Sequence, residues 1–176
     1  MKKKIRLLIS LLILVFLFGC TEEDPNEGTL KVIENIVTYP NEELFDANLL
    51  LLPYDAVEER KESAERTESN WSNAVEEYFA TNCFDSFIYD TPATGLLACA
   101  EILNFTGRYE VKSIELKDVT VKETDTAGNK KFTVSIIVNE VDEHSFETKF
   151  TYDDNGLIEF VYIPAVNEFE AILGVK

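Results

Sequence analysis

The stretch FTVSIIVNEVDEHSFETKFTYDDNGLIEFVYI, residues 132–163, decides the fold of this chain. Apolar and polar residues alternate along most of it with a period of two, which is typical of strands that bury one face. Asp154-Asn155-Gly156 separates the last two runs, and Asn-Gly suits the positive φ values of a type I′ hairpin turn. The predicted inward side chains are Phe132, Val134, Ile136 and Val138, then Phe146, Thr148, Phe150 and Tyr152, before a last strand over residues 157–163.

The residues just before this stretch, from Arg108 onward, also alternate with a period of two. Ile114 and Leu116 share one parity, whereas Val119 and Val121 share the other. A change of parity within a strand-like run predicts a β-bulge or a bend, because it would otherwise turn buried side chains to the solvent. We therefore expect a long, bent first strand and four antiparallel strands in all.

Residues 54–80 have the pattern of a helix. Oppositely charged residues lie three and four positions apart in its first half, and an apolar face with helical spacing follows over residues 71–79. Ser69 and Asn70 favour helix caps, so we expect a break or cap near residues 67–70.

The next segment, residues 81–94, is predicted to be irregular and held by aromatic anchors. Thr94 is a candidate cap for a short helix over residues 95–103, in which four apolar residues share one face. The aromatic anchors are Phe84, Phe87 and Tyr89, and the apolar face consists of Leu96, Cys99, Ala100 and Leu103.

Helices followed by four antiparallel strands form an α+β order. With a bent first strand, this order resembles the NTF2-like (cystatin-like) superfamily, in which a curved sheet wraps helices into a cone; the resemblance covers roughly residues 70–163. Residues 75–79 (VEEYF) and 150–158 (FTYDDNGLI) are also similar to small lipoproteins of Gram-positive bacteria that carry such domains. The resemblance implies N-terminal helices packed on a curved four-stranded sheet, and it implies no single activity.

The first twenty residues have the layout of a secretory signal peptide, with a basic start, an apolar run and a small residue before Cys20. Leu17-Phe18-Gly19-Cys20 resembles the lipobox of bacterial lipoproteins, which implies a diacylglycerol on Cys20 and cleavage before it. The apolar run over residues 7–18 is shorter than the ~20 residues that a membrane span needs. We therefore expect a lipid-anchored protein on the extracytoplasmic face of the cell membrane, in a Gram-positive cell.

The composition divides the chain into four segments. Residues 1–19 are the signal peptide, and residues 20–28 are the lipidated cysteine and a flexible acidic tether. Residues 29–53 are predicted to form an arm with a short strand or a turn of helix, whose leucines at 49–52 pack on the domain. Residues 54–176 are predicted to form the NTF2-like α+β domain.

The chain is strongly acidic, with 33 acidic against 16 basic residues and a formal net charge of −17. Four of the basic residues lie in the signal peptide, so the remainder is more acidic still. This charge argues against nucleic acid as a partner, because phosphates require cationic side chains. It also argues against a body lying flat on an anionic membrane.

A search for catalytic groups finds little. His144 is the only histidine, and it lies in a segment predicted to be a hairpin turn. A zinc site needs three or four His, Cys or carboxylate ligands, and the sequence has no spacing that supplies them. Glycine-rich phosphate loops are absent from the sequence. We expect no catalytic residue, no metal and no cofactor.

Cys83 and Cys99 are the two thiols that remain beside Cys20. An extracytoplasmic location permits a disulfide between them. By closing the loop from residue 83 to residue 99, it would add about 3 kcal/mol to the stability of the fold. Alternatively, both are free thiols that pack as small apolar residues, since Cys99 lies on an apolar helix face.

Two functional hypotheses follow. In the first, the protein is a non-enzymatic binding or interaction module at the cell surface, whose partner could be a protein held through the leucines at 49–52 or through the acidic helix. In the second, an NTF2-like pocket binds a small apolar ligand or catalyses proton transfer, and Tyr109, Phe132 and Phe150 are candidate pocket residues. We favour the first hypothesis, because buried aromatic residues are the ordinary core of such a fold.

Overall fold

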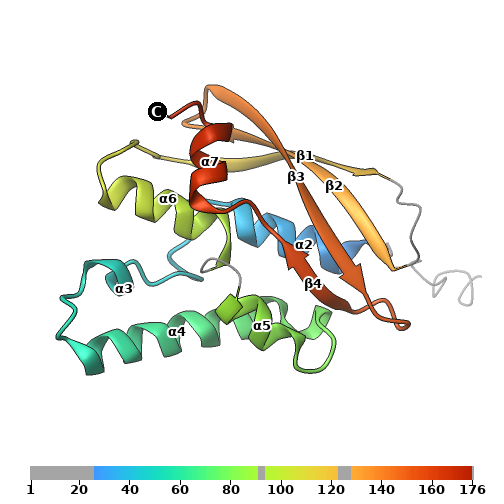
Figure 1. Ribbon diagram of the computed structural model, residues 1–176, viewed down its shortest axis with the longest axis horizontal. Coiled ribbons are helices and arrows are strands. Elements are labelled where there is room, and N and C mark those ends of the chain that lie inside the picture. Colours follow the sequence, from blue (N-terminus) through green and yellow to red (C-terminus); the bar gives the residue numbers. More distant parts are fainter. Residues whose placement is uncertain (1–25, 91–93, 123–127, 176) are drawn as a thin grey trace, which may run out of the picture.

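One layer of the protein is an antiparallel sheet whose strands follow the order β1-β2-β3-β4 (Figure 1). The computed structural model describes residues 26–90, 94–122 and 128–175. The sheet is open, because β1 and β4 form its two edges. Its strands are β1 (Ile114–Lys122), β2 (Asn129–Val138), β3 (Asp142–Tyr152) and β4 (Ile158–Tyr162).

Helices form the second layer, with α2 against β1, α5 against β4 and α7 against β3 (Figure 1). The described residues form six α-helices and one 3-10 helix, so the α+β class predicted from the sequence is confirmed. The helices are α2 (Glu27–Val37), α3 (Asn48–Leu51), α4 (Val57–Val75), η1 (Glu76–Tyr78), α5 (Cys83–Asp90), α6 (Leu96–Phe105) and α7 (Val166–Ile172).

The core lies between the helices and the inward face of the sheet. Phe132, Val134 and Ile136 of β2 are fully buried there, and Trp71 of α4 and Phe169 of α7 are buried in the same cluster. Burying an aromatic or aliphatic side chain of this size stabilises the fold by about 1.5–3 kcal/mol. The opposite face of the sheet carries polar residues, so the predicted alternation is confirmed.

The β-bulge expected from the change of parity is present in β1. The pairing of β1 with β2 shifts between Leu116 and Asp118, which lets Val119 and Val121 face the same side as Ile114. The strand is shorter than predicted, since it begins at Ile114 rather than near Arg108.

The hairpin between β3 and β4 is also present, but its turn differs from the predicted type I′. Gly156 has a φ of 84°, whereas Asn155 does not have a positive φ. The carboxylate of Asp153 accepts hydrogen bonds from the backbone N–H groups of Asn155 (2.9 Å) and Leu157 (2.8 Å). This local bonding stabilises a turn in which only the glycine needs the left-handed conformation.

Two predictions about the middle of the chain are wrong. α4 has no break near residues 67–70, because Ser63, Thr67 and Trp71 continue one buried face through that region. The segment predicted to be irregular contains α5, whose Phe84 and Phe87 are buried three residues apart. The helix expected after Thr94 is present as α6.

The helical content at both ends is larger than predicted. α2 covers residues expected to form a tether and an arm, and its Val32, Ile33 and Ile36 are core residues. α7 was not predicted, although Phe169 anchors it fully in the core. The predicted signal peptide and the predicted lipidation site, Cys20, lie outside the described residues. None of the helices formed by the described residues combines the length and the apolarity that crossing a bilayer requires.

Candidate functional site

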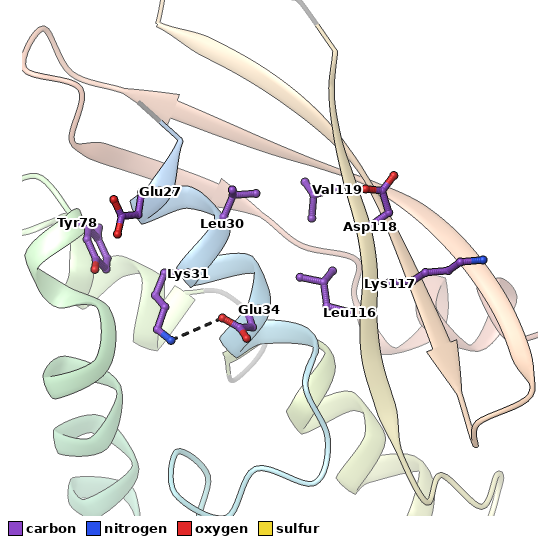
Figure 2. Close-up of a pocket in the computed structure, with 9 residues that line it drawn as sticks. All are labelled: Glu27, Leu30, Lys31, Glu34, Tyr78, Leu116, Lys117, Asp118 and Val119. Atoms are coloured by element: carbon purple, nitrogen blue, oxygen red, sulfur yellow. Dashed lines mark ion pairs between the residues drawn. The ribbon is translucent and has the colours of Figure 1, made fainter. Parts of the chain in front are cut away.

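A groove of about 610 Å³ lies between α2 and β1 (Figure 2). Its apolar side chains come from both walls, with Leu30 on the helix and Leu116 and Val119 on the strand. Figure 2 shows these three side chains between the helix and the strand. The remaining lining residues are Glu27, Lys31, Glu34, Tyr78, Lys117 and Asp118.

The burial of β1 falls along the strand, away from the end at which it pairs with Tyr39. Ile114 is the only buried residue of that strand. Val121 is 43 % exposed, although the residue that pairs with it on β2, Phe132, is fully buried. The inward face of β1 therefore carries Val121, which stays exposed, and Val119, which is only partly buried.

Among the described residues, the outer edge of β1 is also unpaired over most of its length. Tyr39 pairs with Ile114 there, through N–H···O bonds of 3.0 and 2.9 Å, and this is an isolated bridge. Along an antiparallel strand, the backbone N–H and C=O groups of successive residues point alternately to the two neighbouring sides. Counted from Ile114 and through the bulge, those of Val119 and Val121 point to this same outer edge. An edge of this kind is a template for pairing with another extended segment.

The charged residues around the groove are unevenly neutralised. Lys31 pairs with Glu34 at 3.6 Å, and Lys117 points away from the groove to pair with Glu143 at 2.5 Å (Figure 2). In the part of the chain that the structure describes, neither Glu27 nor Asp118 forms an ion pair. Glu27 therefore carries negative charge at the α2 wall that no ion pair balances, whereas Asp118 lies on the side of β1 that faces away from α2 (Figure 2).

Tyr78 closes one end of the groove by packing directly on the backbone of α2. A Cβ atom at Gly28 would lie 2.6 Å from Cδ1 of Tyr78, so only glycine permits this approach. Burial and a hydrogen bond to Glu77 raise the pKa of the Tyr78 hydroxyl, which is therefore neutral at physiological pH. The groove thus has a fixed end, an apolar floor and a free strand edge, which together suit an extended peptide segment.

The structure does not bring the three predicted pocket residues together. Phe132 and Phe150 contact each other edge to face, with ring centroids 5.4 Å apart, and both are buried in the core. Tyr109 lies beyond the end of α6, beside Asn104 and Val111. The aromatic rings predicted to line a cavity therefore fill the interior instead.

Of the two alternatives given for Cys83 and Cys99, a disulfide or free thiols, the structure has the free thiols. Burial raises the pKa of the Cys99 thiol to about 12, which makes it unreactive at neutral pH. His144 lies in β3, where it pairs with Ile136, and not in a turn as predicted. Within residues 26–90, 94–122 and 128–175, no three His, Cys, Asp or Glu side chains are grouped so as to hold a metal ion.

The groove residues were not identified from the sequence. The change of parity at Leu116 marked the bulge, but Val119 and Val121 were expected to be ordinary buried strand residues. Their exposure depends on how far α2 extends across the sheet, which no local pattern contains. Comparisons with family models, with curated proteins and with solved structures find no significant match to this chain.

Proposed function

We propose that this protein is a lipid-anchored, extracytoplasmic binding module without enzymatic activity, which holds an extended segment of a protein partner between α2 and β1. The observation that carries this proposal is the exposure of β1, which buries only Ile114 while the neighbouring strand β2 buries its inward residues throughout. An uncovered strand face beside a free strand edge is a binding surface for another chain.

In the proposed complex, the partner segment pairs its backbone with the edge of β1 after the bulge. Its inward side chains then contact Leu30, Val119 and Val121 and remove their apolar surface from water. A basic residue of the partner lies beside Glu27, whose carboxylate forms no ion pair among the described residues. We therefore expect a partner segment that is extended, alternates apolar and polar residues, and contains a basic residue.

The lipid anchor at Cys20 is proposed from the signal peptide and the lipobox. Only five residues separate Cys20 from Asn26, so this linker reaches at most ~20 Å in any conformation. Lys130 Nζ donates to Asn26 Oδ1 at 2.8 Å and fixes this end of the helix to β2. The end of the molecule that contains the start of α2 and the β3–β4 turn therefore faces the membrane (Figure 1).

We also propose that the domain belongs to the NTF2-like superfamily. Support comes from the element order, the bulge in β1 and the helices on the inward face of an open antiparallel sheet. Aromatic and aliphatic side chains occupy the interior, so the binding surface of this member is placed on the outside, at β1.

Peptide selection tests the binding surface. Peptides are selected from a random display library on the full chain in lipid nanodiscs, and binding is compared among variants. We expect selected peptides to alternate apolar and polar residues, to contain a basic residue and to lose binding to Val121→Asp. Thr120→Asp is the matched control, because it adds the same charge one residue away on the other face. Equal binding to both variants would contradict the proposed surface.

Metabolic labelling tests the anchor separately. Cells grown with labelled palmitate should incorporate the label into the wild-type chain and not into Cys20→Ser. A Cys20→Ser chain that still carries the label would contradict the assignment of Cys20.

A further inference from the structure

A second cleft, of about 440 Å³, lies along the other edge of the sheet, between α5, β4 and the start of α7. Its volume is within the range of pockets that hold small molecules. It is separate from the α2–β1 groove, and no residue lines both. The cleft is lined by Cys83, Ser86, Phe87, Glu159, Phe160, Val161, Tyr162, Ile163, Ala165 and Glu168.

The walls of this cleft are largely aromatic. Phe160 is 57 % exposed and Tyr162 is 39 % exposed, while Phe87, on the α5 side of the cleft, is buried. Exposed aromatic rings beside a cleft leave apolar surface in contact with water, so a ligand with an apolar body gains free energy by covering them.

The charges in the cleft are all negative. Glu159 and Glu168 line it, and no basic residue of the described chain does. Glu168 Oε2 accepts hydrogen bonds from the Tyr162 hydroxyl (2.7 Å) and from the backbone N–H of Ala165 (3.2 Å). These two bonds hold the carboxylate beside the aromatic wall.

Tyr162 already attracts an ammonium group of the chain itself. Lys149 Nζ lies 5.8 Å from the centroid of its ring. Such a contact shows that the ring faces are accessible to cations, which the ring quadrupole attracts. An anionic ligand, by contrast, would be repelled by both carboxylates, and a neutral ligand would leave their negative charge unbalanced.

We propose that this cleft binds a small organic cation, an amine or a quaternary ammonium with an apolar chain. The apolar chain lies against Phe160 and Phe87, and the cationic group lies between Tyr162 and the carboxylates of Glu159 and Glu168. This site does not depend on the lipid anchor or on the α2–β1 groove.

Cys83 provides a local readout, because its partly exposed thiol lines the cleft whereas Cys99 is buried elsewhere in the core. The rate at which iodoacetamide alkylates Cys83 is measured by mass spectrometry on the full chain in lipid nanodiscs. Three probes of equal chain length are compared: hexyltrimethylammonium, 1-hexanol and hexanoate. Cys99, which stays unmodified in the folded protein, reports that the fold is intact.

We expect hexyltrimethylammonium to protect Cys83 at about fivefold lower concentration than 1-hexanol, the effect of one partly desolvated cation–π contact. Hexanoate should give the least protection. Phe160→Ala and Glu168→Gln should each weaken protection by the cation. Phe105→Ala is the matched control, since Phe105 is similarly exposed on α6 and lies outside the cleft.

Three results would overturn the proposed site. Equal protection by 1-hexanol and the cation would show that the cleft recognises apolar chains alone. Protection by none of the probes would show that it binds no ligand of this class. Protection that survives Phe160→Ala would place the bound cation elsewhere.

Discussion

Thr29 Oγ1 and the Tyr152 hydroxyl lie 2.7 Å apart, and this hydrogen bond fixes the first turn of α2 to the end of β3. Thr29 is buried, so its hydroxyl has little access to water as an alternative partner. Lys130 Nζ lies 5.2 Å from the centroid of the Tyr152 ring and also bonds Asn26, which adds a second connection at the same place. The wall of the groove formed by α2 is therefore fixed relative to the sheet.

We predict that Tyr152→Phe lowers the free energy of unfolding by about 1–2 kcal/mol, because it leaves the Thr29 hydroxyl buried without this partner. A double-mutant cycle with Thr29→Val, measured by urea denaturation, isolates the pair. The expected coupling is ~1 kcal/mol, and additive effects of the two substitutions would show that the bond contributes nothing.

The same tyrosine predicts an alkaline pH dependence. Burial raises the pKa of Tyr152 to about 12, against about 10 in an unfolded chain. The folded state therefore holds the proton more tightly, so this contribution to stability is complete below pH 10 and is lost as the pH rises to 12. Tyr152→Phe should lose less stability than the wild type over this interval. If the free energy of unfolding fell equally with pH in the wild type and in Tyr152→Phe, the pKa shift would be contradicted.

A comparison of two inward residues tests whether the β1 face is uncovered. Val121→Ala should change the free energy of unfolding by no more than about 0.5 kcal/mol, since Val121 is 43 % exposed. Ile136→Ala, in the fully buried centre of β2, should cost about 2–5 kcal/mol. Similar costs for both substitutions, measured by denaturant unfolding, would mean that β1 is covered like its neighbour.

Gly95 is predicted to be irreplaceable for stability. Its φ of 85° and ψ of −147° lie in a region that is essentially restricted to glycine, and a Cβ there would overlap Ile36 of α2. Gly95→Ala should cost about 3 kcal/mol or more, from backbone strain and overpacking together. Gly156→Ala, at a similar φ but with open space around it, should cost only ~1–2 kcal/mol. The reverse order of the two losses would contradict this packing.

The proposed lipid anchor at Cys20, with its short linker, predicts how the protein is oriented on a membrane. Asn155, in the β3–β4 turn, lies near the attached end, and Glu140 lies beyond the other end of β2, roughly 30 Å away along the strand. In a Cys83→Ser background, a fluorophore on Asn155→Cys should be quenched by spin-labelled lipids more strongly than one on Glu140→Cys. Stronger quenching at Glu140 would contradict the orientation, and no quenching at either position would contradict the anchor.

The sequence predicted the sheet well, because an alternating pattern is a local property of each strand. The bulge near Leu116 followed from the same reasoning, since only a bulge keeps Ile114 and Val119 on one face. The turn type at Asn155 was missed because the hydrogen bonds that the Asp153 carboxylate accepts from backbone N–H groups outweigh the preference of Asn-Gly for a type I′ turn.

The helices that were missed had recognisable signals. Val32, Ile33 and Ile36 have the spacing of an apolar helix face, and Phe84, Phe87 and Ile88 have it in α5. The candidate site had no such signal. The groove depends on where α2 stops covering β1, and this relation between distant segments arises only when the whole chain has folded.

Amide hydrogen exchange in β1 tests the proposed binding surface most directly. In the free protein, the amides of Val119 and Val121 should exchange fast, because they face the free edge, while the amide of Thr120, on the side paired with β2, is protected. A selected peptide should slow exchange at Val119 and Val121 by about tenfold or more and leave Thr120 unchanged. A bound peptide that leaves Val119 and Val121 unprotected would contradict the account.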